Sequence, residues 1–112
     1  MTDRVGPGLL DDLRSRLRGP VLAPGDEGYD PARAAWNRNA QHRPAVVVQA
    51  ADADDIRTAV QVARTEGLGV GVLATGHGTG RPCDGGMLIN TSALRGVQLD
   101  PTARTARVAA GA

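Results

Sequence analysis

A short glycine-rich stretch holds the residues whose types and spacing could do chemistry. Three glycines alternate around one histidine directly after an apolar run: Gly76, Gly78 and Gly80, with His77 between the first two, following residues 70–73. Glycine has no Cβ, so the backbone can take positive φ angles and several N–H groups can converge on one point. Such a concavity suits a phosphate or pyrophosphate group.

The same stretch differs from the common phosphate-binding motifs. Its spacing is not Gly-x-Gly-x-x-Gly, and no Gly-Lys-Ser/Thr sequence follows. Pro82 and the pair Gly85-Gly86 indicate that the chain continues into a strand and not a helix, so no helix dipole would assist anion binding. A plain turn is therefore an alternative, and any phosphate would be bound by the loop amides alone.

The other reactive side chains nearby are interpreted as structural. A metal site made from His77, Cys83 and Asp84 would have too few ligands and no recognised spacing, so no metal is expected. Cys83 is predicted to be a small, half-buried thiol beside a turn. His42 is predicted to lie on the surface at the entrance to a strand. No residue can be assigned as a catalytic acid or base.

Length and composition bound the class of protein. The 112 residues suffice for one small domain or a piece of a larger one. Aromatic residues make up only 2%, so the core must be built from Val, Leu, Ile and Ala. The formal charge of +1 leaves no excess for a nucleic-acid partner, and no apolar run reaches membrane-spanning length. With one cysteine and no apolar signal region, a cytoplasmic location is expected.

Residues 1–29 are predicted to form an N-terminal helix followed by a loop. The helix has four leucines at helical spacing: Leu9, Leu10, Leu13 and Leu17. Residues 21–29 are rich in proline, glycine and acidic residues and are predicted to form the loop. Asp30 and Pro31 then indicate the start of a short helix, with Asp30 as its cap and Trp36 pointing into the core.

A β-α-β unit is predicted next. Residues 45–48 form a β-branched run typical of a strand covered on both faces. The following helix is predicted to begin after the N-cap Asp52 and to end at Gly67. Its buried face is predicted to carry Ile56, Ala59, Val60 and Ala63. Residues 68–73 are predicted to form a second, buried strand, parallel to the first, with a right-handed crossover. The glycine loop then lies at a carboxyl strand end, where ligands of α/β sheets collect.

The last third of the chain is predicted to be mostly β. Residues 87–89 form a third strand and residues 91–94 a turn, and a β-hairpin joins residues 96–99 to residues 104–108. No obvious element covers the remaining face of the sheet. The sequence therefore predicts an incomplete α+β domain that consists of a β-α-β unit and a hairpin.

Four blocks, in this order, resemble the N-terminal, PCMH-type FAD-binding region of the vanillyl-alcohol oxidase and p-cresol methylhydroxylase superfamily. They are residues 43–48, the predicted helix that contains Asp54-Asp55-Ile56, residues 70–89 and residues 99–108. Within the superfamily the likeness is to bacterial relatives of berberine bridge enzyme and 6-hydroxynicotine oxidase. The resemblance implies that residues 30–112 are the first part of such a domain, truncated at residue 112.

The resemblance also implies a cofactor and a site. The backbone of six residues would bind the FAD pyrophosphate: Ala74, Thr75, Gly76, His77, Gly78 and Thr79. His77 matches the histidine that many members bond through a ring nitrogen to the flavin 8α carbon, while other members hold FAD without a covalent bond. A neutral imidazole is a suitable nucleophile for that bond. Thr75 stands where the family has glycine, and Gly78 where it has a small polar residue.

The implied function is that of an FAD-dependent oxidoreductase, an oxidase that takes a hydride from a small organic substrate and passes electrons to oxygen. The substrate domain and catalytic base lie further along in the family, so these residues alone are expected to be inactive. Two alternatives stay open. One is a truncated, non-catalytic fragment with weak or no FAD binding, and the other is a small α+β interaction domain unrelated to flavin.

Overall fold

The computed structural model describes residues 7–35, 41–75 and 83–112. Over these ranges the chain forms a four-stranded sheet of order β1-β2-β4-β3, three helices and a separate two-stranded hairpin. The elements in chain order are α1 (Pro7–Arg16), β1 (Val21–Leu22), α2 (Tyr29–Arg33), β2 (Val46–Gln49), α3 (Ala53–Glu66), β3 (Val70–Leu73), β4 (Met87–Asn90), β5 (Val97–Asp100) and β6 (Thr105–Val108). None of the helices in these ranges has the length and apolarity needed to cross a membrane.

The three predicted core strands are present, and all are parallel. β4 lies between β2 and β3 and pairs with both, so Leu88 is opposite Val47 on one side and Gly71 on the other. β1 adds an antiparallel strand next to β2, with Val21 opposite Val48. The prediction of a loop over residues 21–29 was therefore wrong at its start, because a two-residue strand is too short to show an alternating pattern.

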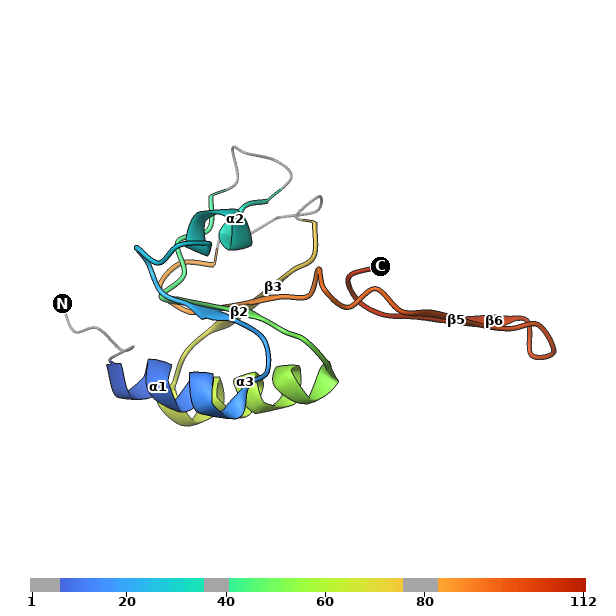
Figure 1. The fold of residues 1–112 in the computed structure, drawn as a ribbon, viewed down its shortest axis with the longest axis horizontal. Coiled ribbons are helices and arrows are strands. Elements are labelled where there is room, and N and C mark those ends of the chain that lie inside the picture. The colour runs from blue at the N-terminus through green and yellow to red at the C-terminus, as the bar shows by residue number, and fades with distance from the viewer. Residues whose placement is uncertain (1–6, 36–40, 76–82) are drawn as a thin grey trace.

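Helices cover both faces of the sheet (Figure 1): α1 and α3 lie on one side and α2 on the other. Val46 and Val48 belong to the cluster under α1 and α3, whereas Val47 packs with Tyr29 and Ala32 of α2. The prediction that β2 is covered on both faces is confirmed. The expected uncovered face is in fact covered by α2, a helix too short for its sequence to reveal an apolar stripe.

α2 begins earlier than predicted and is capped differently. Its N-cap is Gly28, with φ 91°, and no side chain caps it. Asp30 is not the cap but lies in the first turn, where it accepts a hydrogen bond from Arg33 Nε at 2.9 Å. A glycine that takes a left-handed conformation can start the helix without a side-chain acceptor. Trp36, predicted to point into the core, lies outside the described residues.

The hydroxyl of Tyr29 joins α2 to the beginning of β2. It donates a hydrogen bond to the carbonyl of Pro44 at 2.7 Å, within the core. Burial raises the pKa of Tyr29 even though the guanidinium of Arg33 lowers it, so the hydroxyl remains a donor at neutral pH.

Tyr29→Phe is expected to lower the free energy of unfolding by about 1 kcal/mol, because it leaves the buried Pro44 carbonyl without its donor. Urea denaturation followed by far-UV circular dichroism measures this change. A phenylalanine variant with an unchanged midpoint and slope would contradict it.

α3 has the predicted ends but a rotated buried face. Asp52 caps it by accepting the Asp55 N–H at 2.8 Å, and Gly67 ends it with φ 70°. Ala59 and Ala63 are buried as predicted, but Val60 is 43% exposed. The buried stripe is turned toward Asp55 and Val62. The Asp55 carboxylate points inward because it accepts backbone hydrogen bonds from Arg18 and Gly19, in the connection that follows α1, and from Ala51, just before α3.

β3 is an edge strand of the described sheet, and the prediction of a buried strand there was wrong. Val70 and Val72 are 43% and 68% exposed, and only Leu73 is buried. A short apolar run cannot distinguish a central from an edge position, because that depends on strand order.

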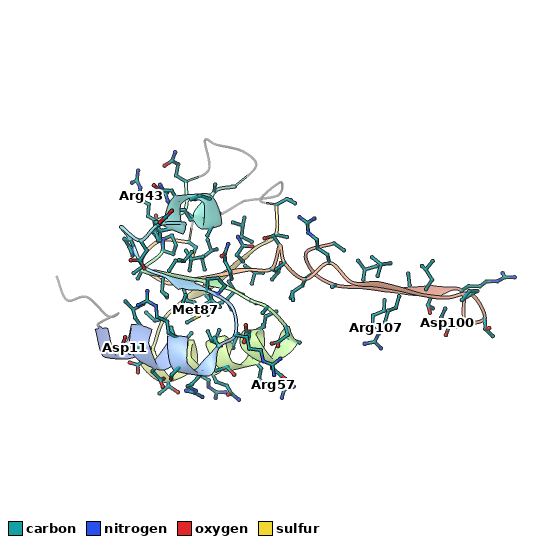
Figure 2. The ribbon with its side chains drawn as sticks, viewed as in Figure 1. Asp11, Arg43, Arg57, Met87, Asp100 and Arg107 are labelled. Carbon is teal, nitrogen blue, oxygen red and sulfur yellow. The ribbon has the colours of Figure 1, made fainter. Side chains whose placement is uncertain are left out.

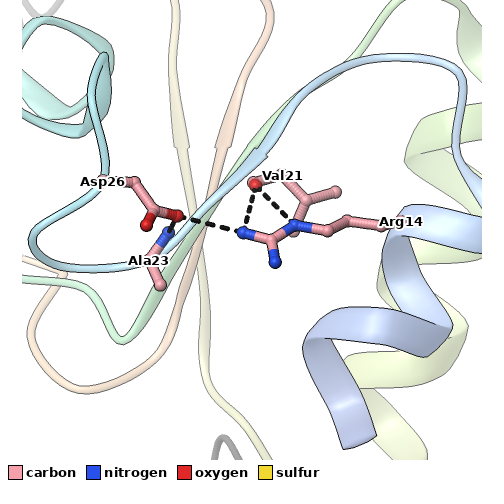
Figure 3. Close-up of polar contacts among 4 residues, drawn as sticks. All are labelled: Arg14, Val21, Ala23 and Asp26. Atoms are coloured by element: carbon pink, nitrogen blue, oxygen red, sulfur yellow. Dashed lines mark hydrogen bonds and ion pairs between the residues drawn. The ribbon is translucent and has the colours of Figure 1, made fainter. Parts of the chain in front are cut away.

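The opposite edge is closed by an arginine from α1 (Figure 3). Arg14 Nε and Nη2 donate to the carbonyl of Val21 at 3.2 and 3.1 Å, and Nη2 also donates to Asp26 Oδ2 at 3.0 Å. Asp26 Oδ2 in turn accepts the N–H of Ala23 at 2.9 Å. The guanidinium thus satisfies an edge carbonyl that would otherwise be open for pairing.

The predicted hairpin of β5 and β6 is confirmed and extends away from the layered part (Figure 1). Asp100 Oδ1 accepts the N–H groups of Thr102 and Ala103 at its turn. Figure 2 shows Asp100 and Arg107 on this arm, far from Met87 in the sheet. Its side chains are exposed, and the apolar ones share one face: Val97, Leu99 and Val108.

Candidate cofactor site

Because β2, β4 and β3 are parallel, their carboxyl ends lie side by side at the same end of the sheet. The glycine-rich stretch begins there. The N–H of Thr91 donates to Leu73 O at 2.9 Å, which fixes the end of β3 against the end of β4. Ala74 is half-buried and Thr75 is exposed. The other four candidate residues lie outside the described residues: Gly76, His77, Gly78 and Thr79.

The side chains of Ala74 and Thr75 fit the chemistry of an anionic group. Both are small and uncharged, so they neither repel a pyrophosphate nor prevent the backbone amides from approaching it. The thirteen arginines nearly balance the acidic residues, and neither of these two positions is charged. At these two positions a bound anion would meet only backbone N–H groups and the Thr75 hydroxyl.

The chain returns from the glycine-rich stretch at Cys83, where it is tied to the segment that leads into β2. The N–H of Arg43 donates to Asp84 Oδ1 at 3.0 Å, and the N–H of Gly85 donates to Arg43 O at 3.0 Å. Gly85 has φ 73°, a conformation that favours glycine. These bonds position the return end of the stretch beside the start of β2.

His42 makes the third of these ties, and the prediction that it lies on the surface was wrong. Its side chain is only 5% exposed, and its Nδ1 accepts the N–H of Cys83 at 2.8 Å. Among the described residues, nothing bonds to its Nε2. Sequence reasoning missed the contact because the two residues are 41 positions apart and meet only when β2 and β4 pair in parallel.

The thiol of Cys83 is half-buried, as predicted. Its Sγ lies 3.6 Å from Met87 O, and Gly71 faces it so closely that a Cβ at residue 71 would be 2.9 Å from the Cys83 Cβ. Burial raises the pKa of the Cys83 thiol, a hydrogen bond from the Gly71 backbone opposes this, and the charge of Asp84 raises the pKa further. The thiol is therefore a poor nucleophile at neutral pH.

A pocket of about 440 Å³ lies between α2 and the segment that leads into β2. Its described lining is Asp30, Pro31, Arg33, Ala34, Ala35, Gln41 and His42. Arg33 is held in place there, because its Nε bonds to Asp30 and its Nη1 donates to His42 O at 2.8 Å. Within the described ranges, no group of three or more His, Cys, Asp or Glu side chains could hold a metal ion.

Comparison with known proteins decides the family. Residues 44–112, more than half of the chain, match the profile of a family described as FAD binding domain. The chain belongs to this family. Its mixed α/β fold is accordingly part of a PCMH-type FAD-binding domain, and its cofactor is FAD.

This FAD-binding chain is similar in sequence to part of several longer flavoproteins. It is 27% identical over 104 residues to an FAD-linked oxidoreductase of Dictyostelium discoideum, covering 92% of this chain and 23% of that protein. It is 26% identical over 97 residues to (R)-6-hydroxynicotine oxidase of Paenarthrobacter nicotinovorans, covering 85% and 21%. The chain thus spans less than a quarter of the length of these relatives.

Solved structures show the same fold. The crystal structure of 6-hydroxy-D-nicotine oxidase from Arthrobacter nicotinovorans superposes with a TM-score of 0.76 at 26% identity, over 85% of this chain and 21% of that one. The xylooligosaccharide oxidase of Myceliophthora thermophila superposes with a TM-score of 0.77 at 25% identity, over 93% and 23%. The resemblance read from the four sequence blocks is confirmed.

Proposed function

We propose that this chain is the FAD-binding part of a flavin-dependent oxidoreductase and that the backbone of residues 74–79 contacts the FAD pyrophosphate. One observation carries the proposal: in a chain of the FAD-binding family, the glycine-rich stretch starts where three parallel strands end. This is the edge at which α/β sheets bind ligands. Residues 30–112 form the first part of the domain; α1 packs on the same sheet, and β1 is one of its strands.

The complete protein is proposed to be an oxidase that acts on a small organic substrate. FAD, when bound, supplies the chemistry of accepting a hydride and passing electrons to oxygen. The residues of this chain hold and orient the cofactor, and residues 1–112 alone are proposed to be catalytically inactive. This is consistent with the relatives, which include oxidases of which the chain covers about a fifth. The cytoplasmic location stays a prediction.

His77→Ala is expected to abolish covalent flavin attachment, because alanine has no ring nitrogen to bond the flavin. The purified protein is precipitated with acid, and the yellow colour is followed into the pellet or the supernatant. The wild type should keep its colour in the pellet, and the variant should release it. Unrelated protein mixed with free FAD and precipitated in the same way controls for trapping.

Two other results are informative. Colour released by the wild type would show a non-covalent FAD site and contradict the role of His77 in attachment. A wild-type protein that is colourless and binds no added FAD would contradict the proposed function and favour the non-catalytic fragment.

A further inference from the structure

We propose that His42 is a positioning residue. Through its neutral imidazole it holds Cys83, at the return end of the glycine-rich stretch that we call the FAD loop. The inference rests on the proposed function, in that residues 74–79 are taken to bind FAD. It concerns a residue outside that stretch, which accepts one hydrogen bond from the backbone of Cys83, where the described chain resumes after it. That bond exists in only one protonation state of the ring.

The geometry defines which state this is. Nδ1 accepts the Cys83 N–H at 2.8 Å, so Nδ1 carries no proton and the neutral ring has its proton on Nε2. A protonated ring has N–H groups on both nitrogens. It would then direct one donor at another donor in a site where the side chain is 95% removed from water.

The charged groups around the His42 ring are bonded to other partners. From α2, the Arg33 guanidinium bonds to the His42 carbonyl, and Asp30 is paired with that arginine. From the segment before β4, Asp84 accepts the Arg43 N–H and the Cys83 thiol faces Met87 O. The Tyr29 hydroxyl is bound to Pro44 O. Over the described residues, no carboxylate reaches Nε2.

The contact lies where it can affect the loop. The outgoing end at β3 is held by the Thr91 N–H to Leu73 O bond, and the return end by the His42 and Arg43 bonds to residues 83 and 84. If His42 lost its acceptor, the partly buried N–H of Cys83 would be without a partner. The chain would shift there to expose it to water, and residues 83 and 84 would no longer be fixed beside the start of β2 when FAD binds.

Two variants separate the acceptor from the bulk of the side chain. His42→Asn places an oxygen near the position of Nδ1 and has no titrating group, whereas His42→Leu fills a similar volume without an acceptor. Amide hydrogen exchange at Cys83 measures the bond itself. FAD affinity, measured by flavin fluorescence at pH 8 in a His77→Ala background, measures the consequence without interference from a covalent link.

We expect His42→Leu to accelerate Cys83 exchange about tenfold and to weaken FAD binding about tenfold at pH 8, the effect of one lost hydrogen bond. His42→Asn should restore both to within about threefold.

The outcomes are distinguishable. Unchanged Cys83 exchange in His42→Leu would overturn the contact, and accelerated exchange with unchanged FAD affinity would overturn the positioning role. An asparagine variant as weak as the leucine variant would show that the acceptor is not what matters. If FAD does not bind even with His42 present, the proposed function fails as well, and the exchange data identify that case separately.

Discussion

Replacing Asp55 with alanine is expected to lower the free energy of unfolding by about 3 kcal/mol, a large effect for a single side chain. The carboxylate is only 2% exposed and lies at the start of α3. It accepts three backbone N–H groups at 2.9 Å each, from Arg18, Gly19 and Ala51. The bonds from Arg18 and Gly19 join α3 to the connection between α1 and β1, and alanine leaves all three partly buried donors without this acceptor.

Asp55→Asn keeps the shape of the side chain but removes its charge and one of its two acceptor oxygens. Oδ1 of Asp55 serves Arg18, and Oδ2 serves both Gly19 and Ala51. An asparagine can offer oxygen in only one of these positions, so at least one donor faces an NH₂ group. We expect a stability between those of the wild type and the alanine variant, measured by urea denaturation at pH 7. Asp54→Asn is the matched control, because Asp54 is exposed and its ion pair with Arg57 is 3.8 Å long.

The same carboxylate makes stability depend on pH. Burial, the largest influence, raises the pKa of Asp55, but the hydrogen bonds from the backbone and the charge of Arg18 outweigh it and lower the pKa below the ordinary 3.8. The unfolded state therefore binds a proton first as the pH falls. The stabilisation by Asp55 is complete above the ordinary pKa and is lost as the pH falls through the lowered one.

Urea denaturation at several pH values tests this sign. The difference in stability between the wild type and Asp55→Asn should be constant from pH 7 to about pH 5 and should shrink below about pH 4. A difference that does not change with pH would show that the carboxylate acts by shape alone.

Gly86→Ala is the second change expected to be severe, with a loss of about 3 kcal/mol or failure to fold. A Cβ at this position would be 2.5 Å from Gly69 O and 3.1 Å from Gly69 C, both backbone atoms. Neither strand can move aside easily. Gly69 O accepts the Met87 N–H at 2.8 Å, and Gly86 O accepts the Ala45 N–H at 2.8 Å. The methyl group would separate β3 from β4 at their starts.

Gly69→Ala provides the matched control for this prediction. It adds the same methyl group to the other glycine of the contact, where nothing lies within 4 Å of the new Cβ. We expect a change of less than about 1 kcal/mol, measured by urea denaturation of both variants. Equal losses in the two would contradict the steric explanation.

Local sequence determined the elements whose signals span only a few residues. The ends of α3 follow from Asp52 and Gly67, which cap the helix through bonds to residues within four positions. The hairpin follows from two short strands around Asp100, whose side chain closes the turn on the next residues. The FAD-binding family also follows from the sequence, because its four blocks are recognised by residue type and order along the chain.

Only the tertiary structure decided what depends on the order of the strands and on distant partners. The exposure of β3 depends on its place at the edge, outside β4, and the rotation of α3 depends on Asp55 meeting Arg18, 37 positions away. The burial of His42 depends on Cys83, 41 positions away. The sequence around a histidine, an aspartate or an apolar run is the same whether the residues end up buried or exposed. Which of the two is more stable depends on partners that are distant in sequence and meet only on folding.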